Sequence, residues 1–483
     1  MILARNPRTG AVDFRFEPTT ASSLADTAAR LRANQPAWAA RPVAERAAIM
    51  LRWADTIEAM RLPIIEALSA DTGRGFLSER EVDGAARNIR RWATMASDIL
   101  GATNRTEIKD SVLINTVRYQ NQFVPYQLAG FISPWNFPVT LSLIDAVPAL
   151  AAGCAVIIKP SEVTSRFVAP LVEAIAAVPE LAEVVAFVVG DGAAGECLID
   201  AVDLICFTGS VPTGRKVAET AARRFIPAFL ELGGKDPVIV MASADLDRAT
   251  DAVLRGSVLN SGQVCLSIER VYVDAQIHDP FVALLARKAS AVTLNIADLL
   301  DGDIGPMIFD RQADIVEAHI ADAIARGARL LAGGTLIRNG GTWCPPTVLA
   351  NCNHDMAIMR EESFGPLLPV MAFSSIDEAV ALANDTDFGL SASVIAGSME
   401  EALPVAERIN AGGISINDCG LTYMTYEPEK TSFGFSGLGG SRMGPASIQR
   451  FLRKKALIIQ SGKPQPIAAF GENAADRLQG QAA

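Results

Sequence analysis

Short apolar runs alternate along the chain with segments of helical periodicity, and this alternation limits the possible folds more than any other feature. The apolar runs lie at 129–132, 155–158, 184–189, 204–207 and 238–241. Strands separated by helices form βαβ units and build a mostly parallel sheet. A second alternating region begins at Val271 and extends to about Asn417. The chain is therefore predicted to be an α/β protein.

The segments before these runs have a different pattern. Residues 22–100 show helical periodicity, with Leu24, Ala28 and Leu31 on one face, and are predicted to cover a sheet. Between Ser111 and Tyr126 polar and apolar residues interleave as in strands, which predicts an exposed hairpin.

Length and charge exclude several classes of protein. The 483 residues suffice for two or three domains. No apolar run reaches the roughly 18 to 20 residues of a membrane span, and no export signal is visible, so we expect a cytoplasmic protein. A net charge of -11 argues against nucleic acid or an anionic membrane as a partner. Small-molecule chemistry is the better expectation.

One of the seven cysteines has unusual neighbours. Cys265 follows Asn, Ser, Gly and Gln, whereas Cys154, Cys197 and Cys206 lie among apolar residues as small buried side chains do. The spacing of the cysteines suggests neither disulfides nor a metal site, so no metal is expected. Cys265 is a candidate nucleophile.

A carboxylate is the better candidate than histidine to act as its base. Glu231 stands in Glu-Leu-Gly-Gly-Lys about thirty residues before Cys265, and none of the three histidines has a motif-like setting. A carboxylate can accept a proton from a thiol and later from water. A Cys/Glu pair is therefore favoured over a Cys/His protease.

Asn136 lies in Phe-Ile-Ser-Pro-Trp-Asn-Phe-Pro, after a predicted strand. Its amide is a neutral donor for the oxyanion of a hemithioacetal, an interaction typically worth about 3 to 4 kcal/mol. The segment alone is equally compatible with an asparagine that caps the next helix.

Three strand ends suggest a nucleotide site. Lys159 and Glu162 follow one apolar strand, Gly190–Gly195 matches GxGxxG after the next, and Gly209–Gly214 forms another glycine-bounded turn. Each signal alone is weak, because a Lys/Glu pair is usually just solvated and the acid expected about 20 residues after GxGxxG is not clear. Together they favour a dinucleotide.

The chain resembles the aldehyde dehydrogenase superfamily over about Leu24 to Gln460. The resemblance rests on segments in family order, namely Pro-Trp-Asn-Phe-Pro from 134, Lys-Pro-Ser-Glu from 159, Phe-Thr-Gly-Ser from 207, Glu-Leu-Gly-Gly-Lys from 231, Gly-Gln-Val-Cys from 262, Glu-Ser-Phe-Gly-Pro from 362 and Ser-Phe-Gly-Phe-Ser-Gly from 432. It implies two Rossmann-like open parallel-sheet domains, a small β oligomerisation element, and oxidation of an aldehyde to its acid with NAD, or alternatively NADP.

The resemblance also implies residue roles. Cys265 is the nucleophile, Asn136 binds the oxyanion, and Glu231 activates the water that hydrolyses the thioester. Lys159 and Glu162 hold the adenosine ribose, Ser210 lies near the pyrophosphate, Gly192 approaches the adenine, and Glu362 and Phe364 hold the nicotinamide ribose and ring. The full expected cofactor site is Ile132, Trp135, Lys159, Ser161, Glu162, Gly192, Gly209, Ser210, Gly214, Leu232, Glu362 and Phe364.

The expected substrate pocket is apolar, which suggests an apolar or aromatic aldehyde. Its residues are Phe137, Leu141, Ile144, Leu259, Val264, Leu266 and Phe433. Relatives that oxidise semialdehydes place arginine near the positions of Ile144 and Leu259, and a buried acidic substrate needs such a cation. If the substrate is a semialdehyde, Arg270 and Arg442 are the candidate cations. A semialdehyde dehydrogenase and a coenzyme A-acylating enzyme remain alternatives, although acylating relatives lack the Glu231 carboxylate. A structural protein that has lost activity is disfavoured, since all three catalytic residues are present.

One motif departs from the family. Many relatives have an SGxGRE segment whose glutamate takes part in a proton relay, whereas this chain has Ser-Gly-Leu-Gly-Gly-Ser-Arg-Met from Ser436 to Met443, with no acid. The relay is therefore absent or rebuilt.

The resemblance implies the domain organisation as well. A cofactor domain comprises 1–110 and 127–232, a catalytic domain comprises 233–433, and an oligomerisation element comprises 111–126 and 434–483. The element combines the exposed hairpin with a late strand at 456–460. Because unpaired strand edges are a liability, a homodimer or homotetramer is expected.

Overall fold

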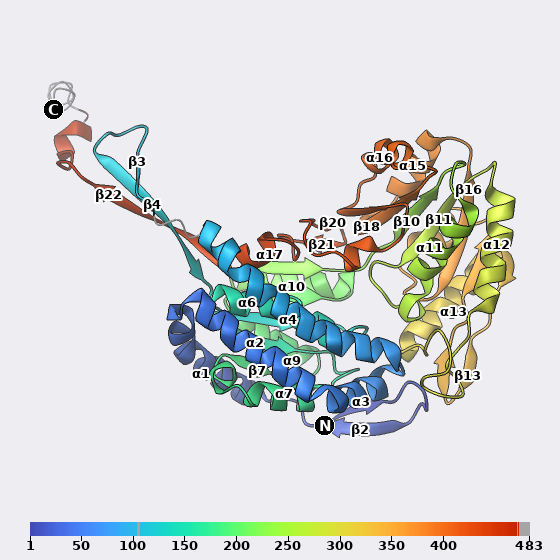
Figure 1. Cartoon of the computed structure of the whole chain (residues 1–483), viewed down its shortest axis with the longest axis horizontal. Coiled ribbons are helices and arrows are strands. Elements are labelled where there is room, and N and C mark those ends of the chain that lie inside the picture. The colour runs from blue at the N-terminus through green and yellow to red at the C-terminus, as the bar shows by residue number, and fades with distance from the viewer. Residues whose placement is uncertain (104–106, 471, 473–483) are drawn as a thin grey trace.

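The computed structural model describes residues 1–103, 107–470 and 472 (Figure 1). It contains two large sheets, and the first is parallel except at one edge. The strand order is β21-β9-β8-β5-β6-β7. The chain proceeds outward from β5 to β7 and then returns to place β8 on the other side of β5. Ligands of open α/β sheets bind where the strand order reverses in this way. The strands are β5 Leu128–Ile132, β6 Ala155–Lys159, β7 Val185–Phe187, β8 Leu204–Thr208, β9 Ala228–Glu231 and the antiparallel β21 Gly437–Leu438.

Two groups of helices pack on this sheet and enclose one hydrophobic core. Their apolar faces explain the helical periodicity of residues 22–100, which form α1 to α4 as the sequence predicts. The helices are α1 Ala21–Ala40, α2 Val43–Ala59, α3 Arg61–Thr72, α4 Phe76–Thr103, α5 Pro138–Leu143, α6 Ala146–Ala152, α7 Val168–Ala176, α8 Pro179–Ala182, α9 Gly192–Ala201 and α10 Val211–Arg223.

The second sheet has the order β12-β15-β16-β11-β10-β18-β19 and is antiparallel only between β12 and β15. Two hydrophobic clusters lie against it. Its strands are β10 Asp236–Val240, β11 Ile268–Asp274, β12 Arg329–Ala332, β15 Thr347–Ala350, β16 Leu367–Phe373, β18 Ser391–Ile395 and β19 Gly413–Ile416. Its helices are α11 Leu246–Val258, α12 His278–Ala291, α13 Asp310–Ala325, α14 Ala357–Arg360, α15 Ile376–Asn384 and α16 Met399–Ala406.

The chain passes between the two sheets twice. The first passage joins the end of β9 at Glu231 to the start of β10 at Asp236. The second returns after β19 and places β21 beside β9, with Gly437 opposite Glu231. Residues 437–438 thus pair with the first sheet, which differs from the expectation that everything after 433 belongs to an oligomerisation element.

A narrow three-stranded antiparallel arm projects from the body (Figure 1). Strand β4 Val117–Pro125 pairs along its length with β22 Leu452–Gln460, and β3 Lys109–Asp110 adds a short third strand. The predicted pairing of the late strand with this region is present. The predicted hairpin is wrong in its first half, because residues 111–116 form the turn between β3 and β4.

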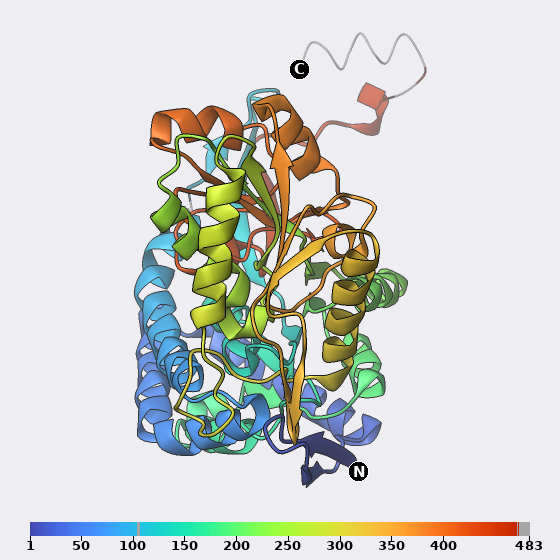
Figure 2. The same ribbon diagram turned by 90° about the vertical axis from the view of Figure 1, so that its right-hand side faces the viewer.

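Small elements complete the structure. The N-terminal pair β1 Ile2–Arg5 and β2 Val12–Phe16 lies at the bottom of the body in both views, away from the arm (Figure 2). The others are β13 Ile337–Asn339, β14 Gly341–Trp343, β17 Phe388–Gly389, β20 Phe433–Gly434, α17 Ala446–Gln449 and the 3-10 turns Leu259–Gly262, Leu421–Tyr423 and Ile467–Phe470. Among the described helices, none has the length and apolar character needed to cross a membrane.

Candidate active site

Cys265 follows a left-handed turn. Asn260 and Ser261 have φ of 54° and 57°, and Gly262 has φ of 72°. Non-glycine residues rarely adopt this conformation, and such strain is concentrated at functional sites. A Cβ on Gly262 would overlap the backbone of Gly365, so only glycine permits this close approach. The turn therefore seats the cysteine against the segment that contains Glu362 and Phe364.

Buried hydrogen bonds hold the turn in place. The Ser261 hydroxyl donates to the Gly305 carbonyl at 2.7 Å, and the Gln263 side-chain amide donates to the Asn260 carbonyl at 2.9 Å. The backbone N–H of Ile308 donates to the Gln263 side chain at 2.8 Å. These contacts offset the backbone strain, because each buried polar group has a partner.

Asn136 lies beside the same turn. Its side-chain amide donates to the Gln263 carbonyl at 3.0 Å, and Arg74 and Asn260 donate to its backbone carbonyl at 2.9 and 3.1 Å. The helix that follows, α5, begins after Phe137 and has no side-chain cap, so Asn136 does not cap it. Of the two readings open from the sequence, the structure disfavours the cap.

Asn136 and Cys265 line one hollow of about 110 Å³. Nine of the residues expected from the sequence meet there, and they come from both sheets. The hollow lies beyond β5 and β8, at the switch point of the first sheet. Its lining is Pro134, Trp135, Asn136, Leu141, Thr208, Gly209, Ser210, Leu232, Gly233, Cys265, Gln312, Glu362 and Phe364.

Glu231 ends β9, next to the residues that line this hollow. It is the strand neighbour of Thr208, and its carboxylate accepts a hydrogen bond from the Ser432 hydroxyl at 2.8 Å. Leu232 and Gly233, which follow directly, both line the hollow.

A buried cationic group lies beside Glu231 and Cys265. Arg442 donates to the Asp145 carboxylate at 2.6 Å and to the Thr208 hydroxyl at 2.8 Å, and Arg450 pairs with the same carboxylate. The pKa of Cys265 is raised to about 12, because burial, with a smaller contribution from the Glu231 carboxylate, outweighs the lowering by the Arg442 guanidinium. Arg442 is thus the nearby charge that favours the thiolate.

Sequence reasoning named Arg442 only as a possible partner for a substrate carboxylate. The missing acid in the segment after Ser436 was the available signal of a rearranged site. Arg270, the other candidate, is fully buried and donates to the carbonyls of Lys235, Leu382 and Ala383, so it is not in the pocket.

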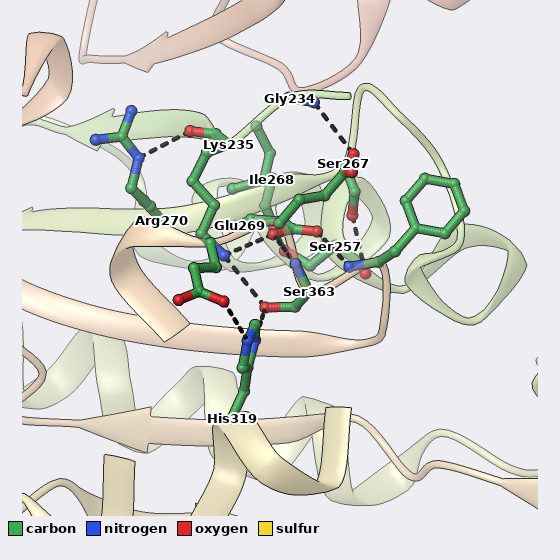
Figure 3. Close-up of polar contacts among 12 residues, drawn as sticks. Gly234, Lys235, Ser257, Ser267, Ile268, Glu269, Arg270, His319 and Ser363 are labelled. Carbon is green, nitrogen blue, oxygen red and sulfur yellow. Dashed lines mark hydrogen bonds and ion pairs between the residues drawn. The ribbon is translucent and has the colours of Figure 1, made fainter. Parts of the chain in front are cut away.

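A second buried ion pair fixes the segment around Phe364 (Figure 3). Lys235 Nζ lies 2.6 Å from the Glu269 carboxylate, which also accepts the backbone N–H groups of Ser363 and Phe364, both at 2.7 Å. Phe364 has φ of 52°, another strained non-glycine residue. The Ser363 hydroxyl contacts Lys235 at 3.2 Å and His319 at 3.0 Å.

Glu269 was missed from the sequence, although the adjacent charges of Glu269 and Arg270 before the apolar run 271–273 were a usable signal. Because both of its oxygens bind the backbone beside Phe364, it sets the direction of that ring. The ring meets Trp135 edge-on at 5.4 Å, at the hollow.

The Glu362 side chain lies against the connection between the two sheets, at Gly233 and Gly234. Its carboxylate accepts the Gly234 N–H at 3.1 Å, and a Cβ on Gly233 would overlap it. Burial raises the pKa of Glu362 to about 8, and the Glu269 carboxylate adds to this effect. A carboxyl of this pKa is mostly protonated at pH 7.

The other expected cofactor residues lie at the carboxyl ends of β6 and β8. Lys159 Nζ is 3.6 Å from the Glu162 carboxylate, and burial lowers the pKa of Lys159. Ser210 precedes the first turn of α10, where backbone N–H groups bind anions readily. Glycines permit close packing, since a Cβ on Gly214 would collide with Leu232. These features fit a dinucleotide.

Ile132, Gly192 and Ser161, which are also expected at the cofactor, occupy less distinctive positions. Gly195 of α9 packs near Ile132, with Gly192 at the start of the same helix. Asp191 caps α9 through the Ala193 N–H at 3.0 Å. The Ser161 hydroxyl accepts the Val163 N–H at 3.2 Å.

A larger cavity of about 640 Å³ lies against the same segment as the hollow. Phe137 and Thr140 line the cavity, while their neighbours Asn136 and Leu141 line the hollow. Helix α4 supplies much of the wall, which no pattern in the sequence indicated. The lining is Phe76, Leu77, Arg80, Glu81, Gly84, Ala85, Arg87, Asn88, Phe137, Thr140, Leu143, Ile144, Arg255, Leu259, Tyr423, Met424 and Tyr426.

Only part of the expected substrate pocket is at this cavity. Phe137, Ile144 and Leu259 line it, and Leu141 lines the hollow. Val264, Leu266 and Phe433 line neither. Val264 is buried within the turn, Leu266 follows the cysteine toward β11, and Phe433 pairs with Gly389 between β17 and β20. The expectation of a wholly apolar wall also needs correction, because three arginines contribute to it.

Comparison with known proteins agrees with this geometry. The model of the aldehyde dehydrogenase family matches residues 2–457. The chain belongs to that family. The predicted family, α/β fold class, enzyme class and NAD(P) cofactor are thereby confirmed.

Two relatives differ in the aldehydes for which they are named. A Mycobacterium tuberculosis protein provisionally named succinate-semialdehyde dehydrogenase (NADP+) 2 is 34% identical over 442 residues, which cover 91% of this chain and 84% of the relative. A 4,4'-diapolycopene aldehyde oxidase of Methylomonas sp is 47% identical over 295 residues, 61% of this chain and 55% of the relative.

Solved structures match more completely. A protein of Anabaena variabilis provisionally named aldehyde dehydrogenase PutA is 50% identical with a TM-score of 0.93, over 96% of this chain and 98% of its own. A betaine aldehyde dehydrogenase of Staphylococcus aureus in complex with NAD+ is 27% identical with a TM-score of 0.89, over 97% of this chain and 93% of its own.

Proposed function

We propose that this enzyme oxidises an apolar or aromatic aldehyde to its carboxylic acid with NAD, through a thiohemiacetal and a thioester on Cys265. The observation that supports this most is the hollow in which Cys265, Asn136 and Glu362 meet at the switch point of the first sheet. The cofactor supplies the hydride acceptor. The protein's side chains carry the remaining steps.

Cys265 forms the covalent bond. Its thiolate adds to the aldehyde carbon, and the carbonyl oxygen becomes an oxyanion that the Asn136 amide stabilises. The amide now donates to the Gln263 carbonyl, two residues before the cysteine, so a small side-chain movement suffices to reach the oxyanion. When the oxyanion collapses, hydride leaves the carbon and a thioester remains.

Glu231 completes the turnover. Its carboxylate accepts a proton from water, the water adds to the thioester, and the acid leaves as the Cys265 thiolate is restored. The hydrogen bond from Ser432 holds the carboxylate near the site. Because Glu231 favours hydrolysis, transfer of the acyl group to coenzyme A is the weaker alternative.

Arg442 has a separate role in this proposal. A guanidinium does not deprotonate in a protein, so it cannot relay protons as an acid would. Fixed by Asp145 and bonded to Thr208, it instead stabilises negative charge on Cys265 and Glu231. The proton from water therefore leaves by way of Glu231 itself.

The choice of NAD over NADP rests on Glu162. Its carboxylate lies near Lys159 at the end of β6, where it would repel a 2'-phosphate. NADP remains the alternative, because Lys159 is a cation and the mycobacterial relative is named for NADP+.

The apolar substrate rests on Phe137, Ile144 and Leu259, which line the larger cavity. The Methylomonas relative, named for a carotenoid-type aldehyde, is consistent with it. A semialdehyde is the second candidate, favoured by the name of the mycobacterial relative and by the arginines in the cavity wall.

We also propose that the enzyme is a cytoplasmic homodimer or homotetramer. The arm leaves Ile458 and Ile459 exposed on β22, and a second subunit would cover them. All seven cysteines are free thiols, which suits a reducing compartment. The domain boundaries at 110, 127, 233 and 434 likewise remain a proposal.

The decisive experiment measures kcat/KM for a panel of aliphatic, aromatic and carboxylate-bearing aldehydes with each cofactor, without coenzyme A. We expect acid formation, with NAD preferred. A strict requirement for coenzyme A would show that the acyl group is transferred rather than hydrolysed.

A further inference from the structure

Two kinds of side chain line the larger cavity. Phe137, Ile144 and Leu259 are apolar and partly buried, and Phe137 directly follows Asn136 of the hollow. Arg80 and Arg87 of α4 line the same cavity and have exposed side chains. An aldehyde whose reactive end is at Cys265 would therefore place its apolar body inside and its far end beside these arginines.

The two arginines lie on one face of α4, since they are seven residues, or two turns, apart. Neither has a carboxylate within ion-pair distance in the described part of the chain, although Asp83, whose pKa Arg61 lowers most, also feels the charge of Arg87. Arg80 stacks over the Phe76 ring at 5.4 Å, and Arg87 forms no ion pair or hydrogen bond within the described part of the chain. Asp83, one turn before Arg87, is instead held by Arg61 at 2.7 Å.

The other charged groups of the cavity wall are occupied. Glu81 is buried and paired with Arg74 at 2.7 Å, and Arg255 pairs with Asp418 and donates to the Cys419 carbonyl at 2.9 Å. Arg80 and Arg87 thus leave an excess of positive charge at the exposed part of the cavity. A guanidinium presents paired N–H donors that suit a carboxylate.

Size also bears on the substrate. A volume of about 640 Å³ is in the range of sites that enclose a drug-sized ligand. A short semialdehyde would leave most of it unfilled and would hold its carboxylate among the apolar side chains. Burying a charge there without a partner is costly.

We propose that the substrate is a long ω-oxo acid, that is, an aldehyde with an extended apolar body and a carboxylate at the far end, which Arg87 and Arg80 bind. This inference rests on the proposed aldehyde oxidation. It gives the arginines of the wall a function and accommodates both the apolar lining and a carboxylate.

The test compares alkanals with ω-oxo acids of equal chain length, roughly C4 to C12. We expect the carboxylate to lower kcat/KM in the shortest pair and to raise it in the longest. The methyl ester of the longest oxo acid, which keeps the length and loses the charge, should behave as the alkanal does. An acid and ester of equal kcat/KM, or a carboxylate effect independent of length, would overturn the proposal.

Variants locate the effect. Arg87→Met should raise KM for the longest oxo acid about three- to tenfold and leave kcat unchanged, because the contact is equal in ground and transition states. Arg87→Lys should recover part of the loss. Arg90→Met is the matched control, since Arg90 is on the same helix but pairs with Asp55 and Glu58 outside the cavity.

These outcomes are separable from failure of the proposed function. If no aldehyde is oxidised, the proposed function is wrong. If alkanals are oxidised but Arg87→Met, Arg80→Met and Arg90→Met all leave the oxo-acid KM unchanged, only the role of the arginines is wrong. Added salt should weaken oxo-acid binding and not alkanal binding, because it screens the exposed charges.

Discussion

Arg442 and Asp145 form a buried ion pair of 2.6 Å beside the catalytic hollow, although 297 positions separate them in sequence. The pair is almost fully enclosed, with side-chain exposures of 10% and 7%. Arg450 contacts the same carboxylate, and Arg442 also interacts electrostatically with Glu231 and Cys265. Arg442 donates to the hydroxyl of Thr208, which lines the hollow, and its charge opposes the burial that raises the pKa of Cys265.

Removal of this cation should make the thiol a weaker acid. We expect Arg442→Met to raise the pKa of Cys265 further, by about one unit, and so to slow its alkylation at pH 8 about tenfold. The measurement is the rate of inactivation by iodoacetamide as a function of pH. In the wild-type enzyme without cofactor, this rate should still increase with pH at the alkaline end, since the pKa is raised to about 12.

Arg442→Lys is the control for that experiment, because it retains the charge but not the forked geometry. It should keep most of the alkylation rate. Equal rates in wild type, Arg442→Met and Arg442→Lys would mean that Arg442 supports the fold without acting on the thiol.

Cys265→Ala should abolish aldehyde oxidation and leave NAD binding largely intact, since the thiol forms the covalent bond but contributes little to the dinucleotide site. Turnover with aldehyde and cofactor titration by fluorescence measure the two properties. Cys197→Ala is the matched control, because Cys197 is also a partly buried free cysteine but lies on α9. Substantial turnover by Cys265→Ala would refute the nucleophile assignment.

Glu231→Gln should slow hydrolysis of the thioester more than hydride transfer. The carboxylate is required when water must be deprotonated, whereas the thioester forms before that step. Rapid mixing should show a burst of NADH and then a slow steady rate. Ser432→Ala, which removes only the hydrogen bond to the carboxylate, should give a milder form of the same profile. Loss of the burst itself would indicate that Glu231 is needed earlier, to activate Cys265.

Glu269→Gln should affect both stability and cofactor use. It leaves Lys235 buried without its partner, which typically costs about 3 to 5 kcal/mol, and weakens the hold on the backbone at Phe364. We expect a lower midpoint of urea unfolding, a higher KM for NAD and slower hydride transfer.

A double variant separates the two effects. Lys235→Met with Glu269→Leu removes both charges, so stability should recover in part, while the NAD kinetics should stay impaired because no carboxylate binds the N–H groups of Ser363 and Phe364. Recovery of the NAD kinetics along with stability would show that the ion pair serves only the fold.

The sequence predicted the parts of the site that lie within short motifs. Local pattern singled out Cys265 and Asn136, the family resemblance added Glu362, and all three line one hollow. The arginines of the cavity wall and of the Asp145 cluster come from an amphipathic helix and a loop, where local pattern does not reveal which distant residue each one meets.

Local proximity also misled at one point. Val264 and Leu266, which flank Cys265 in the sequence, are expected in the substrate pocket, but neither lines the hollow or the larger cavity. Both follow the left-handed turn at 260–262, and Val264 is buried. Similarly, the apolar residues at 112–114 suggested a strand but occupy the turn of the arm, since β22 rather than that segment supplies the long partner for β4.

The last prediction concerns short substrates, for which the arginines of α4 are out of reach. An aromatic or medium-chain aldehyde gains roughly 25 cal/mol for each Å² of apolar surface it buries against Phe137, Ile144 and Leu259. Succinic semialdehyde buries little and desolvates its carboxylate near apolar side chains. Benzaldehyde or hexanal should therefore exceed succinic semialdehyde in kcat/KM by at least about tenfold, or 1.4 kcal/mol in transition-state free energy. Steady-state kinetics at saturating NAD measure this ratio. A preference for the semialdehyde would require a cation close to Cys265, and Arg442 would be that cation, since Arg270 is fully buried elsewhere.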